Sequence, residues 1–185
     1  MTHPIPAYPN QVPSLNETIW ANADAVVLQW RGSPSATTYS NLYQYVDSDS
    51  DSDYVILRNA NVITSPSGTR DLRFDMETPS GEVNPYQTVE LRVRARGYNL
   101  YSANPSNFHV TIKLFEDGSM VTGSGSTQTN MSYSTAEYSH FLSTTAINNV
   151  SNWANVEVDC DFYADGIALD GEITIDVYRV RIIFS

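Results

Sequence analysis

The chain of 185 residues has few basic residues and almost no cysteine. Its single cysteine, Cys160, excludes a disulfide framework and a zinc site built from cysteines. Ten Lys and Arg residues stand against 21 Asp and Glu residues, which gives a net charge of −11. Because phosphate groups are bound by basic surfaces, this balance argues against nucleic acid or an anionic membrane as a partner.

Long hydrophobic stretches are missing too. No run of about eighteen apolar residues occurs, so the sequence predicts no transmembrane helix. The N-terminus lacks an apolar stretch led by Lys or Arg, so we expect no signal peptide and a protein that is made and kept in a cytoplasm. On that expectation the N-x-S/T triplets at Asn16, Asn130 and Asn149 are chance matches.

The residues that are abundant favour β-structure. Ser, Thr and Asn are frequent, whereas Lys occurs once, at Lys113. Helices favour Ala, Leu, Glu and Lys, but Thr, Val, Tyr and Ile favour strands and Ser, Asn and Gly favour the turns between them. Twelve Tyr, six Phe and three Trp residues provide material for a core, which argues against a disordered acidic chain.

Strict alternation of apolar and polar residues predicts individual strands. The clearest example runs from Thr88 to Arg96, with apolar residues on one face and Glu90 and three arginines on the other. The Asp117-Gly118 pair predicts a tight hairpin turn, because both residues tolerate positive φ. Apolar parity changes at Tyr178-Arg179, which predicts a β-bulge. Other predicted strands cover residues 25–30, 54–57, 72–76, 108–114, 120–121, 156–162 and 173–184.

These strands, with one helical turn predicted over residues 146–154, indicate an all-β fold. A two-sheet antiparallel β-sandwich of the jelly-roll type is the prediction, and a closed barrel is the alternative. The predicted sandwich domain covers residues 16–185 and follows an extended proline-rich arm at residues 1–15. We expect the arm to lie on its own body or on a neighbouring subunit. Its predicted contact residues are Pro4, Pro6, Tyr8 and Pro9.

An alternating acidic tract is the one candidate metal site. Asp47, Asp49, Asp51 and Asp53 offer carboxylate oxygens of the kind that Ca²⁺ prefers. The tract does not follow the EF-hand pattern, since neither register places a glycine or the final glutamate correctly. A solvated loop is the alternative, and no other cofactor is predicted.

A row of arginines and several aromatic residues are candidate contact surfaces. Arg92, Arg94 and Arg96 share one strand face, and three acidic residues on the 156–162 strand have the same spacing. This pattern favours a charge ladder across the sheets or between subunits over a site for an anionic ligand. The predicted aromatic interface residues are Tyr43, Tyr45, Tyr98 and Tyr101. Trp20, Trp30 and Trp153, with the tyrosines, are the alternative material for a sugar-stacking platform.

No catalytic pattern is present. The three histidines and Cys160 show no ligand spacing, and there is no G-x-S-x-G turn. The glycine-rich segment at residues 123–127 lacks the lysine of a phosphate-binding loop. We therefore predict a protein that is not an enzyme, with no catalytic residues.

The order of several segments resembles the small β-sandwich virion proteins of tailed bacteriophages, such as capsid decoration, head-fibre or tail-associated modules. The segments are 44–46, 53–55, 89–96, 110–118 and 152–158, followed by a C-terminal β run. The resemblance implies a structural subunit of a virion, made in the host cytoplasm. It also implies a trimer or another symmetric oligomer in contact with virion proteins such as the major capsid protein.

The predicted function is thus structural, as a decoration, cement or accessory subunit that acts through protein–protein contacts. The alternative from another class is a carbohydrate-binding module or a fibre-tip adhesin, for which a glycan would be the partner.

Overall fold

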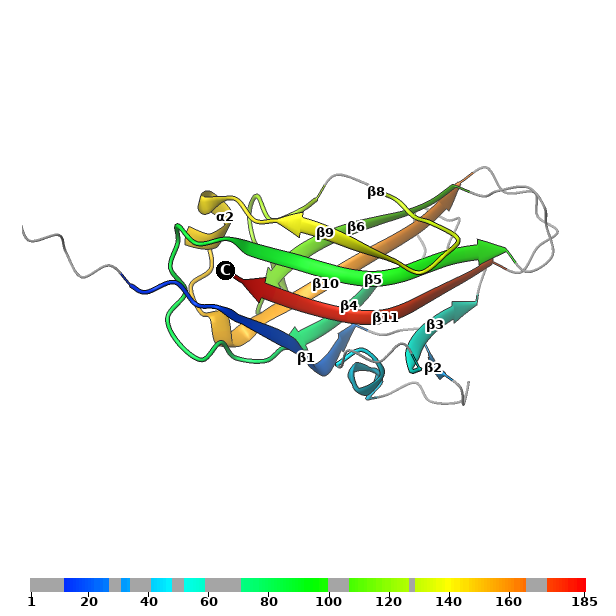
Figure 1. The fold of residues 1–185 in the computed structure, drawn as a ribbon, viewed down its shortest axis with the longest axis horizontal. Coiled ribbons are helices and arrows are strands. Elements are labelled where there is room, and N and C mark those ends of the chain that lie inside the picture. The colour runs from blue at the N-terminus through cyan, green and yellow to red at the C-terminus, as the bar shows by residue number, and fades with distance from the viewer. Residues whose placement is uncertain are drawn as a thin grey trace, which may run out of the picture.

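A computed structural model describes residues 12–26, 31–33, 41–47, 52–58, 71–99, 107–126, 129–165 and 173–185. Within these residues the chain folds into two antiparallel β-sheets that pack face to face, which confirms the predicted β-sandwich (Figure 1). None of the helices in this part of the chain is long and apolar enough to cross a membrane.

The first sheet, sheet A, is built around the C-terminal strand. Its neighbours pair in the order β2, β3, β11, β5 and β9, and every pair is antiparallel. The strands are β2 (Arg31–Ser33), β3 (Tyr54–Arg58), β11 (Ile173–Phe184), β5 (Val89–Asn99) and β9 (Ala136–Phe141).

The second sheet, sheet B, is centred on β10. Its strands are β4 (Asp71–Met76), β10 (Val156–Asp165), β6 (Asn107–Glu116), β7 (Ser119–Met120) and β8 (Thr129–Asn130). β10 lies between β4 and β6, and the two short strands β7 and β8 both pair with β6.

One strand belongs to both sheets. β1 (Glu17–Val26) pairs with β11 over residues 17–20 and with β4 over residues 21–26. Its register shifts between Ala21 and Ala23, so an irregularity turns the strand from one sheet into the other. This corner closes one side of the sandwich.

Side chains of alternating strand positions fill the space between the sheets. On β5 the inward residues from Val89 to Ala95 are fully buried, as are the inward residues of β10 from Val158 to Ala164. Cys160 is among them, which confirms its prediction as a small core residue. The sheets approach closely at Gly97, where an added Cβ would lie 2.5 Å from the Phe108 Cγ atom.

Two local predictions are confirmed by backbone geometry. Asp117 and Gly118 connect β6 to β7 with φ angles of 50° and 75°. The register of β11 against β5 shifts between Val177 and Arg179, which is the predicted bulge. Because the bulge restores parity, the residues on both sides of it keep their apolar side chains in the core.

Other local predictions need correction. The helical turn expected over residues 146–154 is two separate turns, α2 (Thr144–Asn148) and the 3-10 turn η2 (Trp153–Asn155), so Trp153 lies outside the α-helix. β1 begins eight residues before the strand expected at 25–30, and residues 27–30 lie outside the described part. β9 was not predicted, because polar His140 and small Ala136 conceal its alternation.

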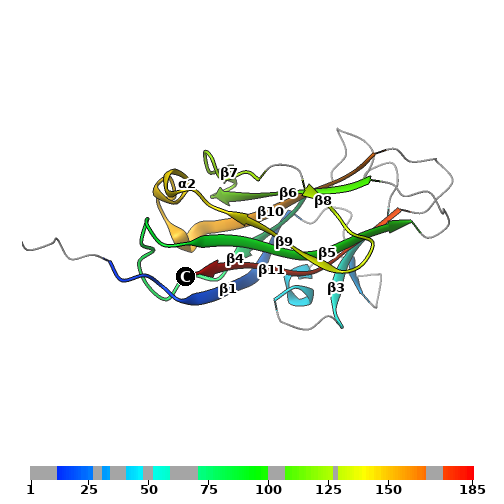
Figure 2. The same ribbon diagram turned by 45° about the horizontal axis from the view of Figure 1, so that its top comes forward.

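The C-terminal end of the predicted arm lies on the body of the protein. The Leu15 amide donates to Gln87 Oε1 at 2.8 Å, and Asn84 Nδ2 donates to the Val12 carbonyl at 2.6 Å. Leu15 also packs against the core. The predicted arm contacts Pro4, Pro6, Tyr8 and Pro9 lie outside the described residues. α2 and the C-terminus lie at the same end of the sandwich (Figure 1 and Figure 2).

Candidate binding surfaces

The outer surface of sheet A collects most of the basic residues that the structure describes. We call the outward residues of β5, β9 and β11 the arginine face. Five of them are arginines and three are acidic, so this face has a net charge of +2 in a protein of net charge −11. They are Arg92, Arg94, Arg96, Arg179, Arg181, Glu90, Glu137 and Asp176.

Four of these arginines face one another in directly opposed pairs. In the register of β5 and β11, Arg94 lies opposite Arg179 and Arg92 lies opposite Arg181. Like charges directly opposite on neighbouring strands destabilise a sheet. The sequence alone showed only the β5 row, because the bulge in β11 brings the second pair of arginines into register with it.

A single carboxylate serves both arginine pairs. One oxygen of Glu137, Oε1, lies 3.9 Å from Arg94 Nη1 and 3.7 Å from Arg179 Nη1. The other oxygen, Oε2, lies 3.9 Å from Arg92 Nε and 3.3 Å from Arg181 Nη2. These contacts are longer than the 2.7–2.9 Å of a strong charge-assisted hydrogen bond. Glu137 therefore lies among four guanidinium groups and accepts a hydrogen bond from one of them, Arg181 Nη2, at 3.3 Å.

The remaining two carboxylates of the face make short contacts. Glu90 Oε2 lies 2.6 Å from Arg92 Nη2, and the fully buried Asp176 lies 2.7 Å from Arg96 Nη2. Burial disfavours the charged form of Arg96, but the hydrogen bond to Asp176 and the charges of Asp176, Tyr178 and Tyr98 together outweigh burial and raise the pKa of Arg96. Glu90 thus pairs with Arg92 at one end of the β5 arginine row, and Asp176 pairs with Arg96 at the other end. Glu137 contacts the arginines between them.

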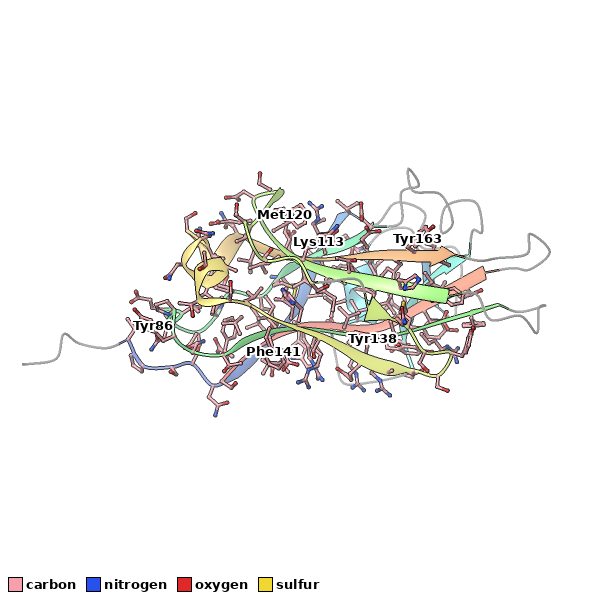
Figure 3. All side chains as sticks on the ribbon, turned by 90° about the horizontal axis from the view of Figure 1, so that it is seen from above. Tyr86, Lys113, Met120, Tyr138, Phe141 and Tyr163 are labelled. Atoms are coloured by element: carbon pink, nitrogen blue, oxygen red, sulfur yellow. The ribbon has the colours of Figure 1, made fainter. Side chains whose placement is uncertain are left out.

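Aromatic rings border the arginines. The Arg181 guanidinium lies 5.3 Å from the Trp20 ring centre, and the Arg96 guanidinium lies 4.7 Å from the Tyr98 ring centre. Both distances suit cation–π contacts. Phe141, at the end of β9, is 60% exposed on the same side of the molecule (Figure 3).

The outer surface of sheet B has the opposite charge. We call the outward residues of β4, β10 and β6 the acidic face; Lys113 and Tyr163 of this sheet are labelled in Figure 3. Among the side chains of this face that the structure describes, five are acidic and two are basic, which gives them a net charge of −3. They are Asp71, Asp75, Glu157, Asp159, Asp161, Arg73 and Lys113.

The centre of the acidic face is a complementary row. Asp159 of β10 lies between Arg73 of β4 and Lys113 of β6, at 3.3 Å from Arg73 Nε and 3.7 Å from Lys113 Nζ. Burial and the neighbouring Asp71 nevertheless raise the pKa of Asp159 to about 6, against the pull of both cations. Beside this row, Asp75 faces Glu157; burial first, and then Glu157 and Asp24, raise the pKa of Asp75.

Two open grooves adjoin at the end of the sandwich that carries α2. The first, the end groove, has a volume of about 480 Å³ between the 78–85 loop and the segment from α2 to η2. Trp153 lines it beside the polar residues Glu82, Asn148, Ser151 and Asn152. Its neighbour, the acidic groove, has a volume of about 370 Å³ and shares Ala154 with it. Asn22, Asp75, Asp117, Asn155 and Glu157 line this second groove.

Glu116 fixes the segment that carries the groove residues. Its carboxylate accepts the Ser151 hydroxyl at 2.6 Å and the amides of Ser151 and Asn152. Burial would raise the pKa of Glu116, but these hydrogen bonds outweigh burial and lower it. The Trp153 ring packs edge-on against Phe184, with ring centres 5.5 Å apart. The sequence named Trp153 as an aromatic candidate and missed its polar neighbours, which are ordinary loop residues until the fold brings them together.

The predicted charge ladder is wrong within one chain. Arg92, Arg94 and Arg96 lie on the outer surface of sheet A, whereas Glu157, Asp159 and Asp161 lie on the outer surface of sheet B. The whole core separates the two rows, and each row finds its partners in its own sheet. A ladder between subunits stays a prediction.

The predicted tyrosine contacts divide into three kinds. Tyr98 joins the arginine face, as described above. Tyr43 and Tyr45, in the 3-10 turn η1 (Leu42–Tyr45), pack partly against the core. That turn is held by Asp24, which accepts the amides of Leu42 and Tyr43, each at 2.8 Å. Tyr101 lies outside the described residues, and subunit contacts by any of these tyrosines stay predictions.

The acidic tract is only partly described. Asp49 and Asp51 lie outside the described residues; burial first, and then Glu77 and Asp53, raise the pKa of Asp47 against a lowering backbone hydrogen bond. In the part of the chain that the structure covers, no three His, Cys, Asp or Glu residues are grouped to hold a metal ion. Calcium binding by Asp47 and Asp53 with the two other aspartates stays a prediction.

Comparison with known proteins found likeness in structure only. No family model matches the chain, and no curated protein is similar to it in sequence. Among solved structures, the chain is similar to a xylan-binding module, CBM15, with 15% identity and a TM-score of 0.44 over 92% of this chain and 97% of that one. It is also similar to the CBM22-1 xylan-binding domain of Paenibacillus barcinonensis, with 7% identity and a TM-score of 0.33 over 94% and 97%.

Proposed function

We propose that this protein is a non-catalytic carbohydrate-binding module that holds a neutral polysaccharide in the end groove and the adjoining acidic groove. The observation that carries this proposal is the lining of the end groove, where the Trp153 ring lies beside two asparagines, a serine and a glutamate. An open groove with an aromatic wall and convergent polar groups is the usual form of a ligand site.

The chemistry of a sugar ring suits this lining. Each ring has an apolar face of C–H groups, which packs on an aromatic side chain, and hydroxyls that donate to and accept from amides and carboxylates. In the acidic groove, Asp75, Asp117 and Glu157 accept hydroxyl hydrogens. Three carboxylates repel a polymer that carries carboxylates of its own, so the grooves favour a neutral chain.

The test is binding of the purified protein to arabinoxylan, β-glucan and galactan, measured by affinity electrophoresis and calorimetry. Because Trp153 packs on Phe184, Trp153→Ala perturbs the core as well as the groove. Trp153→Phe and Asn148→Ala are therefore measured beside it. Tyr133→Ala is the matched control, since Tyr133 is 48% exposed and lies outside both grooves.

We expect at least a fivefold loss of affinity for one of these polymers in Asn148→Ala and Trp153→Ala, a smaller loss in Trp153→Phe and none in Tyr133→Ala. Absence of binding to all three polymers, or equal loss in the Tyr133 control, would contradict the proposal.

A structural role in a phage virion is the second candidate. The observation that favours it is the opposite charge of the two outer faces, which lets the arginine face of one copy meet the acidic face of another. Such a contact is heterologous and closes into a ring, a trimer for example, or extends into a filament. Light scattering of the chain, alone and with capsid proteins, tests this role: an oligomer that dissociates as salt rises is expected, and a salt-independent monomer contradicts it.

A further inference from the structure

The tyrosine that follows the wall of the end groove is exposed to solvent. Tyr86 is next in the chain to Pro85, which lines the end groove, so the Cα atoms of the two residues are about 3.8 Å apart. The Tyr86 residue is 86% exposed, the largest fraction among the large apolar and aromatic residues that the structure describes. Figure 3 shows Tyr86 at the end of the molecule that carries α2. An aromatic ring thus lies in water at the rim of the groove.

The backbone that carries Tyr86 is fixed by a turn at Asn84. The Asn84 Oδ1 atom accepts the Tyr86 amide at 2.9 Å, and the Asn84 carbonyl accepts the Gln87 amide at 3.1 Å. Two residues after Tyr86, Thr88 exchanges two backbone hydrogen bonds with Ser185, at 2.8 and 3.0 Å. The backbone is therefore held on both sides of Tyr86, and only the two torsions of its side chain adjust to a ligand.

The N-terminal segment of residues 12–17 supports the same wall. Beside the contacts of Val12 and Leu15 described above, Glu17 Oε1 accepts the Ser80 amide at 2.8 Å. Leu15 also packs close to Gly81, where an added Cβ would lie 3.3 Å from the Leu15 Cδ2 atom. Because these contacts order the wall before any ligand binds, binding there costs less conformational entropy.

We propose that Tyr86 is a further sugar-binding residue and that the ligand is a chain several sugars long. This inference rests on the proposed function, because it continues the end groove beyond Trp153 and its polar neighbours. The Tyr86 ring packs on the apolar face of one sugar, as the Trp153 ring does for another, and the Tyr86 hydroxyl pairs with a sugar hydroxyl. Single exposed aromatic residues are common on proteins. The position beside the groove and the fixed backbone distinguish Tyr86 from them.

The test compares oligosaccharides of two lengths. Trisaccharides and hexasaccharides prepared from arabinoxylan, β-glucan and galactan are titrated into the protein by calorimetry. For at least one of these polymers, we expect the wild type to bind the hexasaccharide at least fivefold more tightly than the trisaccharide. Tyr86→Ala is expected to lose at least fivefold in affinity for that hexasaccharide and less than twofold for the trisaccharide, since only the longer chain reaches both rings.

Three further variants identify the cause. Tyr86→Phe keeps the ring and is expected to retain most of the affinity for the hexasaccharide. Asn84→Ala removes the acceptor of the Tyr86 amide, so a smaller loss than that of Tyr86→Ala is expected. Tyr133→Ala is the matched control, because Tyr133 is an exposed tyrosine that lines neither groove. Thermal unfolding of Tyr86→Ala is expected to match the wild type, which a merely structural role of the ring would not allow.

Two outcomes would overturn this inference and leave the groove proposal standing. The first is equal wild-type affinity for the two lengths, and the second is a loss for the hexasaccharide in Tyr86→Ala that is absent or that Tyr133→Ala reproduces. An oligomer that Tyr86→Ala dissociates would also overturn it, because the ring would then belong to a contact between copies. Absence of wild-type binding to every polymer and oligosaccharide would contradict both proposals.

Discussion

The two outer faces of this sandwich arrange their charged side chains in different ways. On the acidic face, opposite charges alternate across three strands, and the buried Asp159 lies between Arg73 and Lys113. On the arginine face, two arginine pairs oppose each other across two strands and share the half-exposed Glu137. The acidic face has directly opposed like charges as well, since Asp75 lies opposite Glu157 and Asp71 lies opposite Asp161. The two faces therefore differ in the centre, where a buried carboxylate lies between two cations on the acidic face and a partly exposed carboxylate lies among four arginines on the arginine face.

The core between the two sheets supports both faces, and a change there gives the largest expected effect on stability. Gly97→Ala places a Cβ 2.5 Å from the Phe108 ring, between the sheets. We expect the free energy of unfolding to fall by about 2–3 kcal/mol, as for other overpacked cores. Denaturant unfolding at low and high salt measures this loss, which is the same at both because it is not electrostatic.

Gly125→Ala is the matched control for that experiment, since its added Cβ has Lys113 Cγ at 3.8 Å as its nearest contact. A loss of the same size in both variants would contradict the role of Gly97 in the spacing of the sheets.

Arg73→Gln breaks the complementary row of the acidic face. Among the residues that the structure describes, Asp159, with 1% of its side chain exposed, then keeps Lys113 at 3.7 Å as its one cation. We expect a loss of about 2 kcal/mol at neutral pH, because an incompletely compensated charge stays buried. Chemical denaturation at pH 7 measures it. A change within experimental error would show that the row contributes nothing to stability.

The pH dependence of the acidic face is the next effect in size. The pKa of Asp159 is about 6 in the folded protein and ordinarily 3.8, so between these values the folded state binds more protons than the unfolded state. Stability from this group is present at about pH 4 and is lost as pH rises through 6. Asp159→Asn removes that loss. We expect its stability relative to the wild type to improve by about 1–2 kcal/mol from pH 4 to pH 7, and a flat difference across this range would contradict the raised pKa.

The smallest effect distinguishes the two faces most clearly. Arg179→Gln removes one member of a directly opposed arginine pair on the arginine face, while Arg73→Gln removes the cation that contacts both Glu157 and Asp159 on the acidic face. We expect Arg179→Gln to raise the free energy of unfolding by about 0.3–0.5 kcal/mol at low salt. The gain disappears at high salt because the repulsion is screened. A loss comparable to that of Arg73→Gln would mean that the two faces are equivalent.

Alternation in the sequence predicted much of this fold. The strands of residues 72–76, 88–96, 108–114 and 156–162, the Asp117-Gly118 turn and the bulge after Tyr178 are local patterns, because each depends on neighbours two to four residues away. β9 was not predicted because two of its inward residues, Ala136 and His140, are small or polar and leave only Tyr138 to show the alternation. The helical turn was predicted too late in the chain, because Trp153 resembles a residue that anchors a helix to the core. Trp153 instead begins a separate 3-10 turn, which Asn152 caps.

The candidate surfaces were less predictable. The row of Arg92, Arg94 and Arg96 was visible as a period of two, but its pairing with the acidic row of residues 157–161 within one chain was wrong. Charge complementarity in a sequence does not say which sheet a strand joins. The sequence did not predict the grooves, because their residues come from the 78–85 loop, α2, η2 and three strands, which lie far apart in the chain.

By itself the sequence determined the all-β class, the inward and outward residues of most strands, and an acidic chain with its few cations grouped. These properties follow from composition and from the two-residue repeat of a strand, which every local segment carries. The tertiary structure decided which charged rows face each other, because register and strand order depend on contacts between segments far apart in the chain. It alone placed Arg179 and Arg181 opposite Arg94 and Arg92, and Trp153 beside the polar residues of the end groove.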